Sequence, residues 1–157
     1  MTAAETIRPA RPGDREAIES IVARAYEIYI PRMGKKPGPM LDDYAARIAA
    51  GEAFVLEDEG AVRAVLVLID EPDALLLDNL AVDSESQGHG YGGRLAAFAE
   101  AEASRRGYAE IKLYTHETMT ENVDYYAKRG YAESGRGEQA GYARVFMRKR
   151  LEPVGRV

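Results

Sequence analysis

The sequence predicts an α/β domain in which helices flank a mixed, mostly antiparallel sheet, in the order β-α-α-β-β-β-α-β-α-β-β. Three observations support this prediction. Apolar residues recur with helical spacing in some segments and gather in short strand-like runs in others. Three of these runs follow one another with short turns between them, which favours antiparallel pairing. A glycine-rich turn then connects the third run to an alanine-rich helical segment.

The chain has 157 residues, with 21 Lys and Arg against 26 Asp and Glu, so its formal net charge is −5. Because one domain takes about 100–200 residues, we expect a single domain over residues 5–151, with loose ends at 1–4 and 152–157. An acidic chain without a basic tail argues against a nucleic-acid partner. The sequence has neither the ~20 apolar residues of a membrane span nor a leader-like apolar run at its start. We therefore expect a cytoplasmic protein that does not bind membranes.

The sequence contains no Cys and two His. The absence of Cys excludes a disulfide scaffold, a thiolate metal site and a cysteine nucleophile. Two His leave little for a histidine-rich metal cluster, so we expect no metal.

Residues 1–51 predict a short strand and two helices. A strand over residues 6–8 is followed by Pro and Gly, and Asp14 is expected to be the N-cap of the first helix. That helix of about four turns has one apolar stripe, formed by Ile18, Ile21, Val22, Ala25, Tyr26 and Tyr29. Pro31 is expected to end it, and residues 31–40 to form an irregular loop. The second helix is expected to end at Gly51, and its shared face comprises Leu41, Tyr44, Ala45 and Ile48.

The middle of the chain contains the three strand-like runs, at residues 53–57, 62–69 and 75–82. In the third run Leu75, Leu76 and Leu77 are consecutive, which is typical of a central strand covered on both faces.

The last part of the chain predicts two helices and three strands. They are a helix over 91–106, a strand over 108–114, a helix over 121–129, and a closing hairpin of 131–133 and 141–149.

The glycine-rich turn Gln87-Gly88-His89-Gly90-Tyr91-Gly92-Gly93 lies between a predicted strand and a predicted helix. The first N–H groups of a helix have no intrahelical partner, and the helix dipole attracts anions to this end. Glycines let an oxygen approach the backbone closely, so the turn predicts a phosphate or diphosphate cradle. The alternative interpretation is a glycine-rich connector without a ligand.

Gly88, Gly90 and Gly93 also satisfy the dinucleotide-binding spacing G-x-G-x-x-G. The context is unfavourable, because the preceding strand closes a meander and no second βαβ unit follows. A nucleotide-binding oxidoreductase is therefore a minor alternative. A P-loop is excluded, since no Gly-Lys-Ser/Thr follows the turn.

Three segments together resemble the GNAT superfamily of acetyl-CoA-dependent N-acetyltransferases: LDNLAV at 77–82, QGHGYGG at 87–93 and NVDYYAKRGY at 122–131. Gln87, Gly90 and Gly92 match the family's loop pattern Q/R-x-x-G-x-G/A. The loop follows a strand that ends in Leu-Ala-Val. A later helix carries Asn and Tyr before a Gly and an aromatic residue. The resemblance covers nearly the whole chain, from about residue 5 to 151.

The resemblance implies that acetyl-CoA is a co-substrate whose diphosphate lies on the glycine loop and the helix N-terminus. It also implies that the pantetheine arm pairs with the central strand, where a backbone N–H polarises the thioester carbonyl. Asn122 is expected to bond the amide arm, and the alternative is an ordinary polar residue in the first helical turn. The residues implied in cofactor binding are Leu80, Ala81, Val82, Gln87, Gly88, His89, Gly90, Tyr91, Gly92, Gly93, Asn122 and Tyr126.

Two residues are expected to move protons. Tyr126 matches the family's general acid, which protonates the CoA sulfur. The alternative is a core aromatic residue, and Tyr125 takes the role if the helix register shifts. Asp78 interrupts the apolar run of the central strand, where an unpaired carboxylate is costly. We interpret Asp78 as the general base, and the alternative is a structural carboxylate paired with a basic residue.

These expectations describe an N-acetyltransferase that moves an acetyl group to a primary amine by direct transfer in a ternary complex. The absence of Cys argues against an acetyl-cysteine relay. The expected acceptor is a small-molecule amine, a peptide N-terminus or a lysine, and residues 14–51 carry no motif that identifies it. Dimers are frequent in the family, so a homodimer is a further expectation. The alternative function is a non-catalytic acyl-CoA-binding or sensing domain of the same fold.

Overall fold

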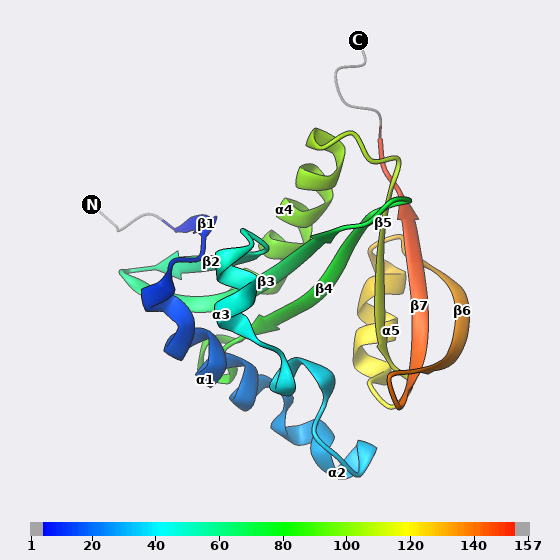
Figure 1. Cartoon of the computed structure of the whole chain (residues 1–157), viewed down its shortest axis with the longest axis horizontal. Helices are drawn as coiled ribbons and strands as arrows, with labels where there is room; N and C mark the ends of the chain where they lie inside the picture. Colours follow the sequence, from blue (N-terminus) through cyan, green and yellow to red (C-terminus); the bar gives the residue numbers. More distant parts are fainter. Residues whose placement is uncertain (1–4, 153–157) are drawn as a thin grey trace. The chain divides into compact units, whose positions relative to one another are not determined.

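The structure is a computed structural model that describes residues 5–152, and within them a sheet of seven strands has the order β1-β2-β3-β4-β5-β7-β6 (Figure 1). The strands are β1 (Thr6–Pro9), β2 (Ala53–Asp58), β3 (Ala61–Asp70), β4 (Leu75–Val82), β5 (Glu110–His116), β6 (Ala132–Gln139) and β7 (Tyr142–Arg150). The helices are α1 (Arg15–Tyr26), α2 (Ile30–Met33), α3 (Tyr44–Ala49), α4 (Tyr91–Arg105) and α5 (Thr120–Lys128). Strands β4 and β5 pair in parallel, whereas β1–β2, β2–β3, β5–β7 and β6–β7 are antiparallel. The predicted α/β class with a mixed, mostly antiparallel sheet is confirmed, and α2 is an additional short helix.

The chain divides into two compact units. Unit 1 comprises Met1–Leu68 and Asn79–Phe98, and unit 2 comprises Ile69–Asp78 and Ala99–Val157. Strand β4 is therefore shared, with residues 75–78 in unit 2 and 79–82 in unit 1.

The core of unit 1 forms where α1 and α3 pack together beside β2 (Figure 1). The predicted stripe of α1 is buried at Ile18, Ile21, Val22 and Tyr26. Strands β2 and β3 contribute side chains that are fully buried, among them Val55, Leu56, Val65 and Leu66. The helical period of α1 thus matches the face that it buries.

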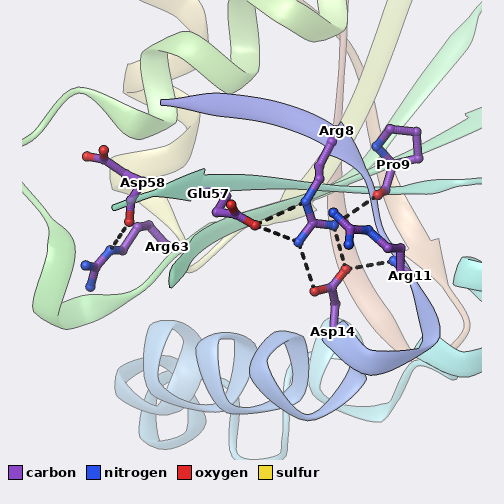
Figure 2. Close-up of polar contacts among 7 residues, drawn as sticks. All are labelled: Arg8, Pro9, Arg11, Asp14, Glu57, Asp58 and Arg63. Atoms are coloured by element: carbon purple, nitrogen blue, oxygen red, sulfur yellow. Dashed lines mark hydrogen bonds and ion pairs between the residues drawn. The ribbon is translucent and has the colours of Figure 1, made fainter. Parts of the chain in front are cut away.

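Arg8 connects three elements of unit 1 (Figure 2). From β1 its guanidinium donates to the Asp14 carboxylate at 2.8 and 3.1 Å and to the Glu57 carboxylate of β2 at 2.9 and 3.2 Å. Asp14 also accepts from the backbone N–H of Arg11 at 2.7 Å. Helix α1 begins after Asp14 as predicted, but the Asp14 side chain makes no capping bond to α1, because it bonds Arg8 and Arg11 instead.

Two predictions about the segment after α1 are wrong. Pro31 does not stop a helix: it lies in the first turn of α2, where a missing N–H costs nothing, and a 3₁₀ turn over Glu27–Tyr29 separates α1 from α2. Leu41 does not share the apolar face of the second helix, because it belongs to a 3₁₀ turn before Asp43 and is 65% exposed. Asp43 caps α3 instead, accepting from the N–H of Ala46 at 3.1 Å.

Asn79 is the first residue of β4 in unit 1 and is only 3% exposed. Its amide oxygen accepts from the Tyr26 hydroxyl at 2.6 Å, and its amide nitrogen donates to the Tyr44 hydroxyl at 3.0 Å. These bonds join α1 and α3 to the strand. They also provide hydrogen-bond partners for a polar side chain whose burial would otherwise destabilise the fold.

In unit 2, the β6–β7 hairpin extends the sheet beyond β5 (Figure 1). Ile111 and Leu113 of β5 and Val145 and Met147 of β7 are buried, and they alternate with less buried side chains on the opposite face. Leu75, Leu76 and Leu77 of β4 are also buried, as the prediction of a central strand requires.

Two strand boundaries in unit 2 differ from the prediction. Strand β5 begins at Glu110 rather than at 108, because Gly107 and Tyr108 complete the turn that ends α4. Strand β6 runs to Gln139 rather than ending at 133. Its exposed sequence lacks an apolar alternation, and pairing with β7 defines its length.

Candidate active site

The glycine-rich turn lies in unit 1 between a 3₁₀ turn at Ser84–Ser86 and the start of α4. Gly88 and Gly90 have φ angles of +90° and +77°, in the left-handed region that residues with a Cβ atom avoid. The N–H of Arg94 donates to the Gly90 carbonyl at 3.1 Å. The N–H groups of residues 91–93 precede this bond, so they have no acceptor within the helix.

Side chains on both sides hold this turn in place. The Tyr91 hydroxyl donates to the Asp58 carboxylate at 2.6 Å, which fixes the first residue of α4 to the end of β2. The His89 ring stacks on Tyr91 with centroids 5.3 Å apart, and its Nδ1 lies 2.9 Å from the Ser86 carbonyl oxygen. Gln87, Gly88, His89 and Gly90 are exposed, so the rigid turn faces solvent.

Arg94 adds a positive charge to the first turn of α4. Its guanidinium donates to the His89 carbonyl at 2.7 Å and pairs with Glu5. A Cβ atom at Gly90 would lie 3.1 Å from Arg94 Nη1, so glycine also provides room for this side chain. Helix N–H groups, two left-handed glycines and a guanidinium together form a cradle suited to a phosphate or diphosphate.

The end of β4 lies beside this cradle. The position of a Cβ atom on Gly92 would be 3.5 Å from Val82 Cγ2 and 3.9 Å from Leu80 Cδ2. Ala81 is buried, whereas Leu80 and Val82 are partly exposed. The structure therefore brings Leu80 and Val82 together with the glycine turn.

Tyr126 lies in unit 2 on α5 and is 7% exposed. Its ring contacts those of Tyr125 and Tyr131 edge-on, with centroids 5.1 and 5.4 Å apart. The Tyr126 hydroxyl forms no hydrogen bond to any of residues 5–152. In that range, every side-chain nitrogen or oxygen that is completely buried has a hydrogen-bond partner. The Tyr126 hydroxyl is therefore not completely buried, although the residue as a whole is. Burial raises the pKa of Tyr126 above that of a free phenol, so the hydroxyl keeps its proton at neutral pH.

Asn122 lies in the first turn of α5, which is the position that both of its interpretations require. Its amide nitrogen is 3.5 Å from Thr115 Oγ1 and 3.7 Å from Met119 Sδ. These long contacts join the start of α5 to the end of β5, and they are weaker than a normal hydrogen bond.

Asp78 is the last residue of β4 in unit 2 and is partly exposed. Its carboxylate accepts a hydrogen bond from the Tyr114 hydroxyl at 2.7 Å. Burial, followed by the nearby Asp78 charge, raises the pKa of Tyr114 to about 12. Tyr114 therefore keeps its proton and acts as a donor to the carboxylate rather than as a base.

Arg144 of β7 lies over the ring of Tyr114. Its guanidinium carbon is 3.7 Å from the centre of the Tyr114 ring and 5.8 Å from that of Tyr142. A pocket of about 390 Å³ in unit 2 has Tyr114 among its lining residues. Its lining also includes Leu76, Lys112, Phe146, Arg148, Glu71, Ser134 and Gln139.

Tyr114, Arg144 and Arg94 were not among the residues that sequence reasoning selected. Tyr114 belongs to a predicted strand, but its partner Asp78 is 36 residues away, and no local pattern connects the two. The alternation of apolar and polar residues in β7 places Arg144 on the less buried face. This alternation is the sequence feature from which Arg144 could have been selected as a candidate site residue.

Within residues 5–152, no group of three or more His, Asp or Glu side chains has an arrangement that could hold a metal ion. None of the helices in this range combines the length and the apolar character needed to cross a membrane.

The sequence model of the acetyltransferase (GNAT) family matches residues 16–131, and the chain belongs to this family. No curated protein matches the chain in sequence.

Solved structures share the fold. The ribosomal-protein-S18-alanine N-acetyltransferase from Escherichia coli is 22% identical with a TM-score of 0.74, and the match covers 97% of each chain. The PaiA N-acetyltransferase from Thermoplasma acidophilum, in complex with coenzyme A, is 15% identical with a TM-score of 0.77, over 94% of this chain and 99% of that one. Naa20 from Chaetomium thermophilum, with a bisubstrate analogue, is 17% identical with a TM-score of 0.72, over 93% and 86%. At these identities the likeness shows the fold alone.

Proposed function

We propose that this protein transfers the acetyl group of acetyl-CoA to a primary amine, directly and within a ternary complex. The observation that carries this proposal is the glycine turn at the start of α4, where Gly88 and Gly90 adopt left-handed backbone angles. The family defines the class of reaction as acyl transfer.

The cradle of unit 1 fits the diphosphate of CoA. The N–H groups of residues 91–93 have no acceptor within α4, and Arg94 supplies a cation beside them. The space around Gly88 is open, which leaves room for a phosphate oxygen close to the backbone. The coenzyme A in the PaiA structure of the same fold supports this assignment. In this proposal Gln87 and His89 border the cradle, and Asn122 bonds the amide arm.

When bound, acetyl-CoA supplies the thioester whose acetyl group is transferred. The amine must lose a proton, since a free amine has a pKa near ~10. Asp78 accepts this proton, directly or through a water molecule, while the Tyr114 hydroxyl holds its carboxylate in place. A backbone N–H among residues 80–82 donates to the carbonyl oxygen as negative charge develops on it.

Tyr126 completes the proton balance. The amine nitrogen forms a bond to the acetyl carbonyl carbon. The C–S bond then breaks, the sulfur leaves with the electron pair, and the Tyr126 hydroxyl donates its proton to that sulfur. Because this hydroxyl bonds no residue in the described range, it is available to a ligand atom. Because burial raises the pKa of Tyr126, its hydroxyl stays protonated at neutral pH until the thiolate leaves. The amine nitrogen loses a second proton once its bond to carbon has formed, and this loss balances the proton that Tyr126 takes back from solvent. The free enzyme is restored when the proton on Asp78 also passes to solvent.

The acceptor is a small-molecule amine, a peptide N-terminus or a lysine. Two neighbours of the same fold carry names that refer to an alanine of ribosomal protein S18 and to a bisubstrate analogue, which supports an amine acceptor in general. A cytoplasmic location and a homodimer stay predictions of the sequence.

The test combines binding with turnover. Acetyl-CoA should raise the Tm of the protein, and a panel of amines should release CoA thiol when acetyl-CoA is present. Binding without release by any amine would favour the acyl-CoA-binding or sensing domain. If acetyl-CoA neither raises the Tm nor reacts, the proposed function is wrong.

A further inference from the structure

The residues of β4 that belong to unit 1 follow the point where the pairing of β4 with β5 ends. The parallel ladder comprises Leu75, Leu76 and Leu77 of β4 and does not include Asp78. Residues 79–82 come after this point, where β4 loses the support of one of its two neighbouring strands. The proposed transfer uses a backbone N–H of residues 80–82 as a donor to the thioester carbonyl. Such a donor is effective when its peptide is already held in the right orientation.

Asn79 is 3% exposed, and hydrogen bonds from two helices fix the orientation of its amide. The Tyr44 hydroxyl of α3 donates its single hydrogen to the Pro39 carbonyl at 2.6 Å. The Tyr44 oxygen is therefore the acceptor for the Asn79 amide nitrogen at 3.0 Å. The Asn79 amide oxygen then accepts from the Tyr26 hydroxyl of α1 at 2.6 Å. Reversing the Asn79 amide would set two acceptors against each other at Tyr44.

The backbone next to Asn79 is contacted from both faces of the strand. The Tyr26 hydroxyl, which bonds the Asn79 side chain, also lies 3.5 Å from the Leu80 carbonyl oxygen. The Leu80 side chain leaves the opposite face, because successive residues of a strand alternate. There it lies beside Gly92 of α4, whose Cβ atom would be 3.9 Å from Leu80 Cδ2. The peptide between Asn79 and Leu80 is thus held between α1 and the start of α4.

The polar character of Asn79 explains why this arrangement is rigid. Within residues 5–152, every completely buried side-chain nitrogen or oxygen has a hydrogen-bond partner, so the network around Asn79 leaves none of its buried atoms unpaired. A shift of the strand would break bonds to buried groups that water does not reach, and each broken bond costs free energy. A fully paired buried network therefore selects one position of the strand more strictly than apolar packing alone.

We propose that Asn79 is a positioning residue for acetyl transfer, because its two amide bonds fix the β4 backbone that meets the thioester carbonyl. This inference rests on the proposed acetyl transfer. Asn79 acts through the N–H groups of residues 80–82 rather than by touching the acetyl group or the amine. A displaced backbone weakens the donor in the transition state and lowers kcat. The glycine turn is a separate part of unit 1, and it still binds the diphosphate.

The first test removes one hydroxyl at a time. Tyr26→Phe and Tyr44→Phe each keep the ring and remove one bond to the Asn79 amide. We expect kcat to fall by about 10-fold in each, since complete loss of a donor to the developing oxyanion costs roughly 100- to 1000-fold. The Kd of CoA, measured by calorimetry, should not change. Stability alone does not predict this separation of kcat from Kd.

Val22→Ala is the matched control. Val22 is 1% exposed and lies one turn before Tyr26 on the buried stripe of α1. Its truncation lowers the Tm through lost packing but leaves every bond of Asn79 in place. At a temperature where all variants are folded, Val22→Ala should keep the kcat of the native protein.

A double variant tests whether Tyr26 acts through Asn79. Asn79→Ala removes both amide bonds, so adding Tyr26→Phe to it should cause no further loss of kcat. If the two losses multiplied instead, Tyr26 would act independently of Asn79 and the inference would be wrong.

Spectra of ¹⁵N-labelled protein without ligand give a measurement that needs no turnover. The amide signals of Leu80, Ala81 and Val82 should move in Tyr26→Phe and in Tyr44→Phe. The same signals should stay in place in Val22→Ala. Unmoved signals in both phenylalanine variants would show that the network does not set the position of this backbone.

Two kinetic results would also overturn the inference and leave the acetyl transfer standing. One is a kcat of both phenylalanine variants equal to that of Val22→Ala. The other is a loss of kcat accompanied by an equal loss of CoA affinity. If the native protein itself neither binds acetyl-CoA nor acetylates any amine, the proposed function is rejected before any variant is compared.

Discussion

The Tyr114 hydroxyl donates a hydrogen bond of 2.7 Å to the carboxylate of Asp78, from β5 to the neighbouring β4. This bond reduces the cost of a carboxylate in an apolar central strand, because an aromatic donor pairs with it and the residue is partly exposed. The phenol of Tyr114 keeps its proton, because burial and then the nearby Asp78 charge raise its pKa to about 12, so it acts as the donor of this bond.

The substitution Tyr114→Phe tests this pair. It removes the donor but keeps the ring under Arg144, so we expect kcat/KM for amines to fall by roughly 10-fold, about the value of one charged hydrogen bond. Tyr108→Phe is the control, because Tyr108 donates a similar bond of 2.8 Å to the exposed Asp70. Equal activity of both variants in CoA-thiol release would contradict a role for the Tyr114 hydroxyl.

Tyr126→Phe should lower kcat by roughly 100-fold, which is typical of a lost general acid. The Kd of acetyl-CoA should change little, since the ring and its contacts with Tyr125 and Tyr131 remain. Tyr125→Phe, on the exposed side of α5, is expected to retain activity. Calorimetry for Kd and stopped assays for kcat separate the two effects. An unchanged kcat would remove Tyr126 from the mechanism.

The raised pKa of Tyr126 also predicts the shape of the pH profile. A phenol is a proton donor only below its pKa, and burial moves that pKa above ~10. We therefore expect that kcat shows no decline caused by Tyr126 as the pH rises from 7 to about 10. A decline near pH 9 that disappears in Tyr126→Phe would contradict the burial of this group.

Gly90→Ala should weaken acetyl-CoA binding by about 10-fold or more, equal to at least 1.4 kcal/mol. Its Cβ atom would be 3.1 Å from Arg94 Nη1, and its φ of +77° is unfavourable for alanine. Gly34→Ala matches the backbone strain, with a φ of +73° and open space around it, at the C-cap of α2. Both variants should lose similar Tm, whereas Gly34→Ala should bind acetyl-CoA normally. Equal loss of binding would mean that the effect is one of stability alone.

Arg8→Met should lower the free energy of unfolding by about 1–3 kcal/mol at pH 7, because it removes charged hydrogen bonds to two carboxylates. The Arg8 guanidinium lowers the pKa of Asp14, so this stabilisation is complete above the unfolded-state pKa near ~3.9. It is lost as the pH falls through the lower folded-state pKa. Denaturant titrations should therefore show that the difference from the native protein shrinks below about pH 4.

Arg15→Met is the control for that series. Arg15 pairs with Glu19 along the exposed surface of α1, with side chains 55% and 46% exposed, and such pairs contribute little. If Arg15→Met lowered the free energy of unfolding as much as Arg8→Met, the Arg8 hydrogen bonds would contribute no more than those of an exposed ion pair.

The sequence predicted those parts of the fold in which period and burial coincide. The stripe of α1 and the leucines of β4 are examples, because each pattern corresponds to one buried face. Strand β6 could not be delimited, since its residues are exposed and its length follows from pairing with β7. The prediction that Pro31 ends a helix is wrong, because proline breaks a helix only when it lies in the helix interior. Pro31 lies in the first turn of α2, where proline is tolerated.

The part of the candidate site that is built from consecutive backbone groups could be predicted from the sequence. The glycine turn and its place before α4 follow from adjacent residues. Tyr114 and Arg144 meet only because β5 and β7 pair, and strand pairing is a long-range property. Asp78 could be selected from the sequence because an unpaired carboxylate in an apolar strand costs free energy. That argument did not identify the Tyr114 hydroxyl as the donor of its hydrogen bond.

Asn79 binds Tyr26 and Tyr44 through its two amide atoms, so the segment between these tyrosines is tethered at both ends to one strand residue. A tethered segment can gain or lose residues at small entropic cost, since each doubling of loop length costs only about 0.6 kcal/mol. A change in the length of residues 27–43 therefore carries a small loop-closure cost while β4 keeps its place. Asn79 itself is the residue that such a change has to preserve.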